Sequence, residues 1–407
     1  MFNQVLIILF WVIFIYCSFS VLYLFTFAMA AKFFKRYKSA ATYLPLKKIA
    51  VLVPAYKEDE IILATAQNIL RQDYPAELFD VYIIADSFRN ITIEQLEKLR
   101  ANVLQVSFAN SSKTKSLNEC FKNIHNYYDI ALICDADNML AKGFLKKIND
   151  AFLNGAHAIQ GRRVAKNLDT SFAILDGCSE AINNNIFRKG ANALGISSSV
   201  IGSGMAFEFD TLRAVLSQIS AISGFDKPLQ LKITEVGTKI IYLEDALIFD
   251  EKVDNPDAFK QQRKRWLLSQ FIYLKEYFFK GCRQLLKGNV SYFNLAVANN
   301  LVPPRAFLIA GLPALCIAGW FIQLFIQLPV IFYATVLLLG LYFISMIIAV
   351  PAELKNKKLL NALLHLPGAI MLMIGNLFRM KRAKKVFIHT IHTKNEITNP
   401  LYKMYGE

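Results

Sequence analysis

The sequence has few cysteines and none of the spacings that would make them a metal or disulfide framework. Six are scattered over 407 residues without a Cys-x-x-Cys pair, which indicates buried free thiols in a reducing compartment. The five histidines show no metal-ligand spacing either. The net charge of +15 comes without a long Lys/Arg run or zinc-finger spacing. It therefore favours anionic lipid or a phosphorylated ligand as the partner over nucleic acid.

Charged side chains are absent from residues 1–31. Crossing a bilayer takes about 20 apolar residues, so this segment is long enough to do so. It lacks a basic start and a small-residue cleavage site, which predicts an uncleaved anchor. Lys32, Lys35, Arg36 and Lys38 follow at once. We therefore expect a protein of the cell (inner) membrane. The positive-inside rule places its N-terminus outside and the next domain in the cytoplasm.

Long apolar runs return near the C-terminus. Those near 306–326 and 329–350 are predicted to cross the bilayer as a pair. A third run, 359–378, would leave five basic side chains outside if it crossed, so we expect a re-entrant or interfacial element. These runs predict a multi-pass membrane region at 305–380 and a basic cytoplasmic tail at 381–407.

Residues 48–255 follow a different pattern, with short β-branched runs separated by helical stretches. The runs lie at 49–56, 81–86, 130–137 and 239–249. Strands that alternate with helices predict a parallel α/β sheet, whose functional groups gather at the carboxyl ends of the strands. Glu58, Asp86 and the pair Asp135 and Asp137 each follow one of these runs. This coincidence is the first indication of a site.

Asp135 and Asp137 place two like charges at the end of a buried strand. Alternate residues of a strand point to one face, so the two carboxylates are expected to lie side by side. They would repel each other unless a divalent cation or a donor-rich ligand removed the conflict. A single Asp after a strand is more often a turn residue or a helix cap, so the order of the other motifs decides.

The remaining motifs follow one another in a fixed order. They are "PAYKEDE", "ADS", "SSKTKSLN", "CDAD", "GSGMAFE", "FDKPLQLKITEVG" and "QQRKRW". With them the sequence resembles the processive, inverting glycosyltransferases of the cellulose, chitin and hyaluronan synthase type, within glycosyltransferase family 2. The resemblance covers roughly residues 48–270. Its most specific element is the Q-x-x-R-W signature, the substrate-binding residues Gln262, Arg265 and Trp266.

The resemblance implies a GT-A fold, the α/β fold of nucleotide-diphospho-sugar transferases, joined here to transmembrane helices. It also implies a UDP-linked sugar donor, with Glu58 and Asp86 on the nucleoside and Lys115 beside the nucleotide. Asp137 would be the main metal ligand, while Asp135 would hold ribose or diphosphate and support the metal. Mg²⁺ or Mn²⁺ suits oxygen ligands of this kind.

The catalytic base of such enzymes takes a proton from the acceptor hydroxyl. The family carries it as the Asp of a Thr-Glu-Asp segment that opens a helix. Here Asp226 follows Gly224 and Phe225, and the Glu is missing. Asp245 in "YLEDA" is the alternative, but it lies too close to Gln262. The helix, turn and strand spacing favours Asp226 as the base, a residue that would also cap its helix.

The segment 256–304, which carries the Q-x-x-R-W signature, is amphipathic and is expected to lie in the membrane interface. Trp266 would stack on an acceptor sugar or anchor in the interface, and Arg265 would pair with the diphosphate. Arg263 is expected in a solvated or lipid-facing charge run. Gly204 is predicted to let the backbone approach a sugar closely, although a structural turn explains one glycine nearly as well.

The leading interpretation is a membrane-bound, metal-dependent, inverting glycosyltransferase with a glycan or lipid acceptor. Two versions stay open: a processive polymerase that exports its chain, and an enzyme that adds one sugar to a lipid-linked or other acceptor. Q-x-x-R-W favours the polymerase, and the small number of spans weakens it. A transporter, or a tethered nucleotide binder without chemistry, is the alternative class; a transporter would need polar residues inside the spans. The sugar and the oligomeric state are not specified.

Overall fold

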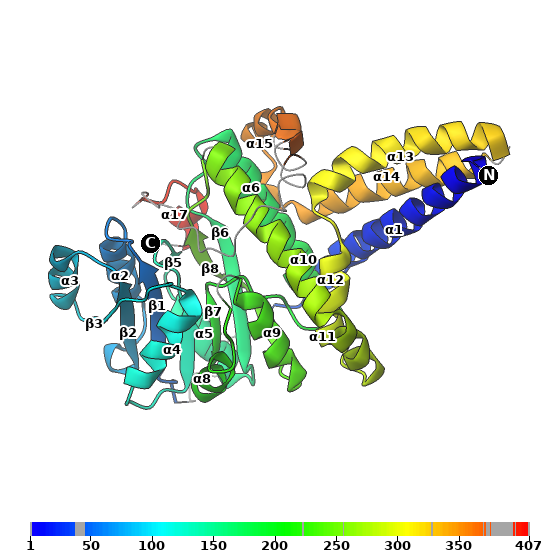
Figure 1. The fold of residues 1–407 in the computed structure, drawn as a ribbon. Helices are drawn as coiled ribbons and strands as arrows, with labels where there is room; N and C mark the ends of the chain where they lie inside the picture. The colour runs from blue at the N-terminus through cyan, green and yellow to red at the C-terminus, as the bar shows by residue number, and fades with distance from the viewer. Residues whose placement is uncertain are drawn as a thin grey trace.

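The computed structural model describes residues 2–36, 45–221, 224–254, 256–326, 329–368, 370, 371, 375, 394 and 396–405. An α/β domain is built on one eight-stranded sheet, and three long apolar helices project from it as a group (Figure 1). Two further helices, α6 and α10, lie between the sheet and that group (Figure 1). The arrangement agrees with the prediction of an α/β domain joined to apolar helices.

The sheet has the order β3-β2-β1-β4-β7-β6-β8-β5. The strands are β1 (Ile49–Tyr56), β2 (Phe79–Asp86), β3 (Asn102–Val106), β4 (Ile130–Ile133), β5 (Met139–Leu140), β6 (Ala158–Ala165), β7 (Met205–Glu208) and β8 (Ile240–Asp250). Neighbours among β3, β2, β1 and β4 are parallel, as predicted. The second half is mixed, because β7 runs antiparallel to both β4 and β6 while β6 and β8 are parallel.

The central strands are apolar throughout because helices cover both faces of the sheet. Alternate residues of β1 enter different cores. Ile49, Val51 and Val53 pack in one, and Ala50 and Leu52 pack in the other. The first core is covered by α2 (Ile62–Leu70), α3 (Asn90–Glu97) and α5 (Phe144–Leu153). The second is covered by α4 (Lys113–Asn123), α8 (Phe209–Leu216) and α9 (Asp226–Glu235).

A helical layer connects the sheet to the apolar helices. It contains α6 (Ser171–Asn183), which continues through the π-helical η3 (Asn184–Gly190) into α7 (Ala191–Ala193), and the 31-residue α10 (Pro256–Leu286). The amphipathic segment 256–304 is therefore mostly one helix. Short helices complete it: α11 (Val290–Phe293), η4 (Asn294–Ala298) and α12 (Asn299–Leu301).

Three described helices are long and apolar enough to cross a membrane: α1 (Phe2–Ala30), α13 (Arg305–Ile326) and α14 (Val330–Ala349). They pack on one another through a shared apolar core that includes Phe10, Leu24, Leu312 and Tyr342. Their outer faces are exposed apolar surface, with Ile15, Ile317 and Leu337 each at least 60 % exposed. Their positions match the three predicted spans.

The remaining described helices are short. They are η1 (Ala31–Phe33), η2 (Ala76–Leu78), η5 (Ala352–Leu354), α15 (Lys357–Leu363) and α17 (Leu401–Tyr405). α15 covers the start of the predicted third apolar element, 359–378, whose later part lies largely outside the described residues. Of the basic tail, the described end packs against the α/β domain, where the Tyr402 ring meets Phe249 edge-on.

Gly190 marks the closest approach between η3 and α1. A Cβ added at this glycine would overlap the carbonyl oxygen of Phe27, a backbone atom that cannot rotate away. The glycine thus lets the first apolar helix lie directly on the helical layer.

We predict that Gly190→Ala destabilises the protein by about 1–3 kcal/mol, the usual cost of overpacking. The midpoint of thermal unfolding of the detergent-purified protein would fall accordingly. Gly311→Ala in α13 is the matched control, because its Cβ would meet nothing within 4 Å. A Gly190→Ala midpoint equal to that of the control would contradict the close approach.

Candidate active site

The carboxyl ends of β2, β1 and β4 meet at one edge of the sheet, because these three strands are parallel neighbours. One cavity of about 1010 Å³ opens there, and Glu58, Asp86, Asp135 and Asp137 all line it. Four acidic residues from separate parts of the sequence are therefore brought together. Their position is the one that open α/β sheets use for ligands.

Asp86 ends β2 and is 1 % exposed. Ser87 Oγ donates a hydrogen bond of 2.9 Å to its Oδ1, whereas its Oδ2 is buried and has no partner among the described residues. Buried polar atoms are normally satisfied, so Oδ2 is an acceptor without a partner in a residue that lines the cavity. Lys57 and Ser87 have left-handed backbones, with φ of 55° and 61°. Strain of this kind concentrates at binding sites.

Asp135 and Asp137 both lie in the turn after β4, which ends at Ile133. The two carboxylates share the cavity because of this turn; the predicted alternation along a strand does not apply, since the strand ends earlier than expected. Burial raises the pKa of Asp135. The Lys113 ammonium lowers this pKa, and the Asp137 carboxylate raises it; the net change is upward. Ser203 Oγ accepts a hydrogen bond from the Asp135 N–H at 2.9 Å and fixes the turn.

Lys113, rather than Lys115, points into the cavity. Lys113 Nζ pairs with Asp135 Oδ1 and donates to the Gly202 carbonyl at 2.5 Å. Lys115 is exposed and donates to the Asn110 carbonyl at 2.7 Å, away from the lining. Residues two apart on a helix differ by about 200° in direction, so only one of these lysines can face the site. The lysine that lines the cavity is thus two residues before the predicted Lys115.

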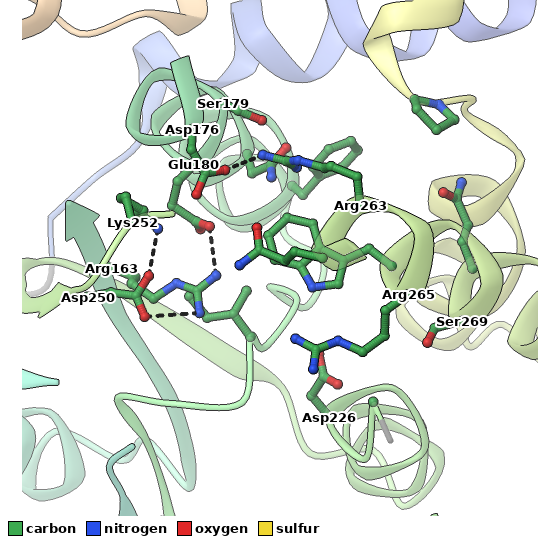
Figure 2. A pocket seen from close by; sticks show the side chains of 18 of the residues that line it. Arg163, Asp176, Ser179, Glu180, Asp226, Asp250, Lys252, Arg263, Arg265 and Ser269 are labelled. Carbon is green, nitrogen blue, oxygen red and sulfur yellow. Dashed lines mark hydrogen bonds and ion pairs between the residues drawn. The ribbon is translucent and has the colours of Figure 1, made fainter. Parts of the chain in front are cut away.

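Asp226 is the first residue of α9 and lines the cavity. Figure 2 shows the Arg265 side chain of α10 reaching towards it. Burial lowers the pKa of Arg265, and the nearby Asp226 and Asp135 carboxylates oppose that change. Gly224, with φ of 66°, provides the left-handed turn before the helix. The side chain predicted as a base thus has an arginine beside it in the same cavity.

Asp245 lies elsewhere. It is exposed within β8, which continues to Asp250, and its carbonyl accepts a 2.7 Å hydrogen bond from Lys147. The adjacent Glu244 pairs with Lys189 at 2.5 Å. Neither acidic residue lines the cavity.

The Q-x-x-R-W residues Gln262, Arg265 and Trp266 all line the cavity from α10. Arg263 also lines it, contrary to the expectation of a solvated or lipid-facing charge. Its guanidinium pairs with Asp176 of α6, and its side chain is 11 % exposed. The helix turns successive residues to different sides, which places Arg263 against α6 and Arg265 towards α9 (Figure 2).

A buried ion network forms the wall between these groups (Figure 2). Arg163 of β6 pairs with Glu180 at 2.8 Å and with Asp250 at 3.7 Å. Lys252 pairs with Asp250 at 2.7 Å, and Arg188 pairs with Glu180 at 3.1 Å. Sequence reasoning missed all five residues, because they come from three distant segments and match no local motif.

Both carboxylates of the network have lowered pKa values. Burial alone would raise the pKa of Asp250, but Arg163 and Lys252 outweigh it and bring that pKa to about 2. Burial would likewise raise the pKa of Glu180, and the two neighbouring arginines hold it below its ordinary value. Breaking any of these pairs would leave a buried charge without a partner, which is far more costly than losing an exposed ion pair.

Gly204 is not among the residues that line the cavity. Its φ is 61°, and a Cβ there would come 2.9 Å from Ile248 Cγ2 of β8. The close approach that this glycine permits in the described structure is to the Ile248 side chain of β8, which is separated from β7 by β6 in the sheet.

The opposite end of the cavity is apolar. It is formed where the apolar helices meet the helical layer, by residues of α13, α14 and α15 and the residues after α15. They include Ile309, Met346, Val350, Leu359, Leu363 and Leu366. A single cavity therefore runs from the carboxylates at the sheet edge to the base of the apolar helices.

A family model described as "Glycosyltransferase like family 2" matches residues 45–269, more than half of the chain. The chain belongs to this family. The match covers the sheet, the cavity carboxylates and the Q-x-x-R-W signature, so the family predicted from these motifs is confirmed.

Two curated relatives are similar over part of their length. Beta-monoglucosyldiacylglycerol synthase from Synechocystis sp. (strain ATCC 27184 / PCC 6803 / Kazusa) is 23 % identical over 69 % of this chain and 59 % of its own. N-acetylglucosaminyltransferase from Rhizobium meliloti (strain 1021) is 25 % identical over 56 % of each chain. This chain thus spans somewhat more than half the length of these relatives.

A solved structure resembles most of this chain. The mannosyltransferase PcManGT from Pyrobaculum calidifontis, in complex with GDP-Man and Mn2+, has a TM-score of 0.51 at 16 % identity. The likeness covers 93 % of this chain and 99 % of that one. At this identity it shows the fold, which is the GT-A-type α/β fold with added apolar helices.

Proposed function

We propose that this protein is a membrane-bound inverting glycosyltransferase that transfers one sugar from a nucleotide-sugar donor to a lipid acceptor. The observation that carries the proposal is the single cavity, which joins acidic side chains at the sheet edge to an apolar wall at the foot of α13 and α14, two helices long and apolar enough to cross a membrane. A lipid could place its head at the first end and its chain at the second.

The donor in this proposal is a UDP-sugar held at the sheet edge. The open Oδ2 of Asp86 would accept from the nucleoside, with Glu58 beside it. Lys113 takes the role first assigned to Lys115, because its ammonium faces the cavity. The relative with GDP-Man bound makes a GDP-sugar the second donor to test.

Asp135 and Asp137 fit Mn²⁺ or Mg²⁺, because both carboxylates line the same cavity and both metals prefer oxygen ligands. Among the described residues no group of three His, Cys, Asp or Glu side chains forms a complete protein site. The donor diphosphate would therefore supply further oxygens. When bound, the ion would neutralise the charge that develops on the leaving diphosphate.

Asp226 is proposed as the base. Its carboxylate would take the proton of the acceptor hydroxyl while that oxygen attacks the anomeric carbon and the bond to the diphosphate breaks. Arg265, which lies beside Asp226 (Figure 2), would stabilise the departing diphosphate through charged hydrogen bonds. Attack on the face opposite the leaving group gives inversion.

Single transfer to lipid is favoured over polymer export. The three described span-length helices meet through a largely apolar core, whereas a growing hydrophilic chain would need a polar path across the bilayer. The Q-x-x-R-W signature, which favours a polymerase by resemblance, serves a single transfer equally well. Its three residues line the cavity, and in this proposal they would face the donor.

Purified full-length protein given Mn²⁺, radiolabelled UDP- or GDP-sugars and a bacterial lipid extract should label a lipid that carries one sugar. Excess chelator should abolish labelling, because the carboxylate pair repels a metal-free diphosphate. Label recovered in a water-soluble polymer would overturn the proposal in favour of the polymerase. Release of free sugar alone would also overturn it.

Asp226→Asn should lower transfer by a factor on the order of 10² to 10⁴, the usual worth of a general base. Nucleotide binding and folding should persist, because Asn keeps the volume and caps a helix about as well as Asp. Asp245→Asn is the matched control and should retain activity, since Asp245 is exposed and outside the cavity. An inactive Asp245 variant beside a normal Asp226 variant would reverse the assignment.

A cytoplasmic catalytic domain can be tested with a natural thiol. Cys282 on α10 is partly exposed, whereas the other five cysteines are buried. A membrane-impermeant maleimide should label the protein only after cells are permeabilised, and Cys282→Ser should lose the label. Labelling of Cys282 in intact cells would show that the topology is inverted.

A further inference from the structure

Two arginines lie where the cavity meets the apolar helices. Arg263 belongs to α10, and Arg305 is the first residue of α13. Both line the cavity, together with Pro304 and Ala306 at the start of α13. They are thus placed at the junction between the polar and apolar ends of the cavity.

The charge of Arg305 has no carboxylate partner within ion-pair distance among the described residues. Its guanidinium donates to Ser179 Oγ at 2.6 Å, to the Ser179 carbonyl at 3.0 Å and to Asn183 Oδ1 at 2.8 Å. All three acceptors are neutral. A partly buried cation of this kind is expensive unless an anion balances it.

Arg263 has one carboxylate partner and spare capacity. One terminal nitrogen pairs with Asp176, while its Nε is buried without a hydrogen-bond partner among the described residues. Its guanidinium is held over the rings of Phe259, at 4.9 Å, and Trp266, at 4.5 Å. Asp176 thus pairs with Arg263 alone, and Arg305 has no carboxylate partner among the described residues, which leaves an excess of positive charge.

The start of α13 adds to this excess. The first turn of a 22-residue helix presents the positive end of its dipole. This end opens on the cavity beside Arg305. Hydrogen-bond donors and positive charge thus converge on one place, next to the apolar wall formed by α14 and α15.

We propose that Arg263, Arg305 and the start of α13 bind the phosphate of the acceptor lipid, so that the acceptor class is a phosphate-bearing lipid. This inference rests on the proposed lipid glycosyltransferase. The phosphate would sit at the junction, the hydrocarbon chain along Met346 and Val350, and the accepting end of the head group towards Asp226. Guanidinium groups suit phosphate because they donate two parallel hydrogen bonds.

The donor diphosphate has cations of its own. Lys113 contacts Asp135 at the sheet edge, and Arg265 reaches towards Asp226. Arg263 instead reaches towards Asp176 on α6 (Figure 2). The two arginines of α10 thus point in different directions, which separates an acceptor anion from the donor.

The test measures binding of two lipids with identical acyl chains, dioleoyl phosphatidic acid and dioleoylglycerol, to the full-length protein in detergent. The wild type should prefer phosphatidic acid by at least tenfold. Arg305→Gln should reduce that preference about tenfold to a hundredfold, the worth of hydrogen bonds to a charged group. Arg305→Lys should restore part of it. Arg283→Gln, which removes an exposed charge from the same helix as Arg263, should leave the preference unchanged.

Asp176→Asn tests the proposal in the opposite direction, because this substitution should increase the affinity for phosphatidic acid. It removes the carboxylate that competes for Arg263 at nearly constant volume, so phosphatidic acid should bind more tightly than to the wild type. Tighter binding cannot result from misfolding, which keeps the proposal testable if Arg305 variants prove unstable. Weaker or unchanged binding in the Asp176 variant would overturn the role of Arg263.

Equal affinity of the wild type for the two lipids would overturn the proposal. So would inorganic phosphate that displaces phosphatidic acid at equal concentration, since the site would then recognise free phosphate. Labelling of a neutral lipid alone in the transfer assay would reject the phosphate subsite while the lipid glycosyltransferase stands. Labelling of no lipid would reject both.

Discussion

The cost of burying charge governs this structure. The cavity carries acidic and basic side chains from the sheet edge to the foot of helices that expose hydrocarbon-like surface. Unpaired charges in such a place are destabilising. Most of these charges are paired, as in Arg163–Glu180, Lys252–Asp250 and Arg263–Asp176. Groups that remain incompletely paired, such as Asp86 Oδ2 and Arg305, are then the best candidates for ligand contacts.

α10 connects the two ends of the cavity. One helix lines the cavity with Gln262, Arg265 and Trp266. It directs Arg265 towards Asp226 and Arg263 towards α6 (Figure 2). Its 31 residues also lie along the short helices that lead into α13. Donor chemistry and acceptor placement are thus tied to one rigid element, which gives the Q-x-x-R-W signature a role without a polymer channel.

Much of the fold was predictable because its signals are local. The apolar runs predicted α1, α13 and α14, and the β-branched runs predicted β1, β2, β4 and β8. β3, β5, β6 and β7 were missed because they are short or polar: β5 has two residues, and β6 carries Arg162 and Arg163 within "AIQGRRVA". The site followed the same rule. The carboxylates after the strands could be identified from the order of the motifs along the sequence. Choosing between Lys113 and Lys115 required knowing where α4 begins. The ion network could not be predicted, because its residues meet only in the tertiary structure.

The central claim is that one cavity holds both the sugar-transfer site and the lipid chain. Photo-crosslinking tests it directly, using a lipid with a diazirine on its acyl chain, the full-length protein in nanodiscs and mass spectrometry of the adducts. The account predicts adducts on cavity residues such as Met346 and the buried Leu359, in addition to the outer faces of the helices. Adducts confined to outward-facing residues such as Ile317 and Leu337 would contradict it.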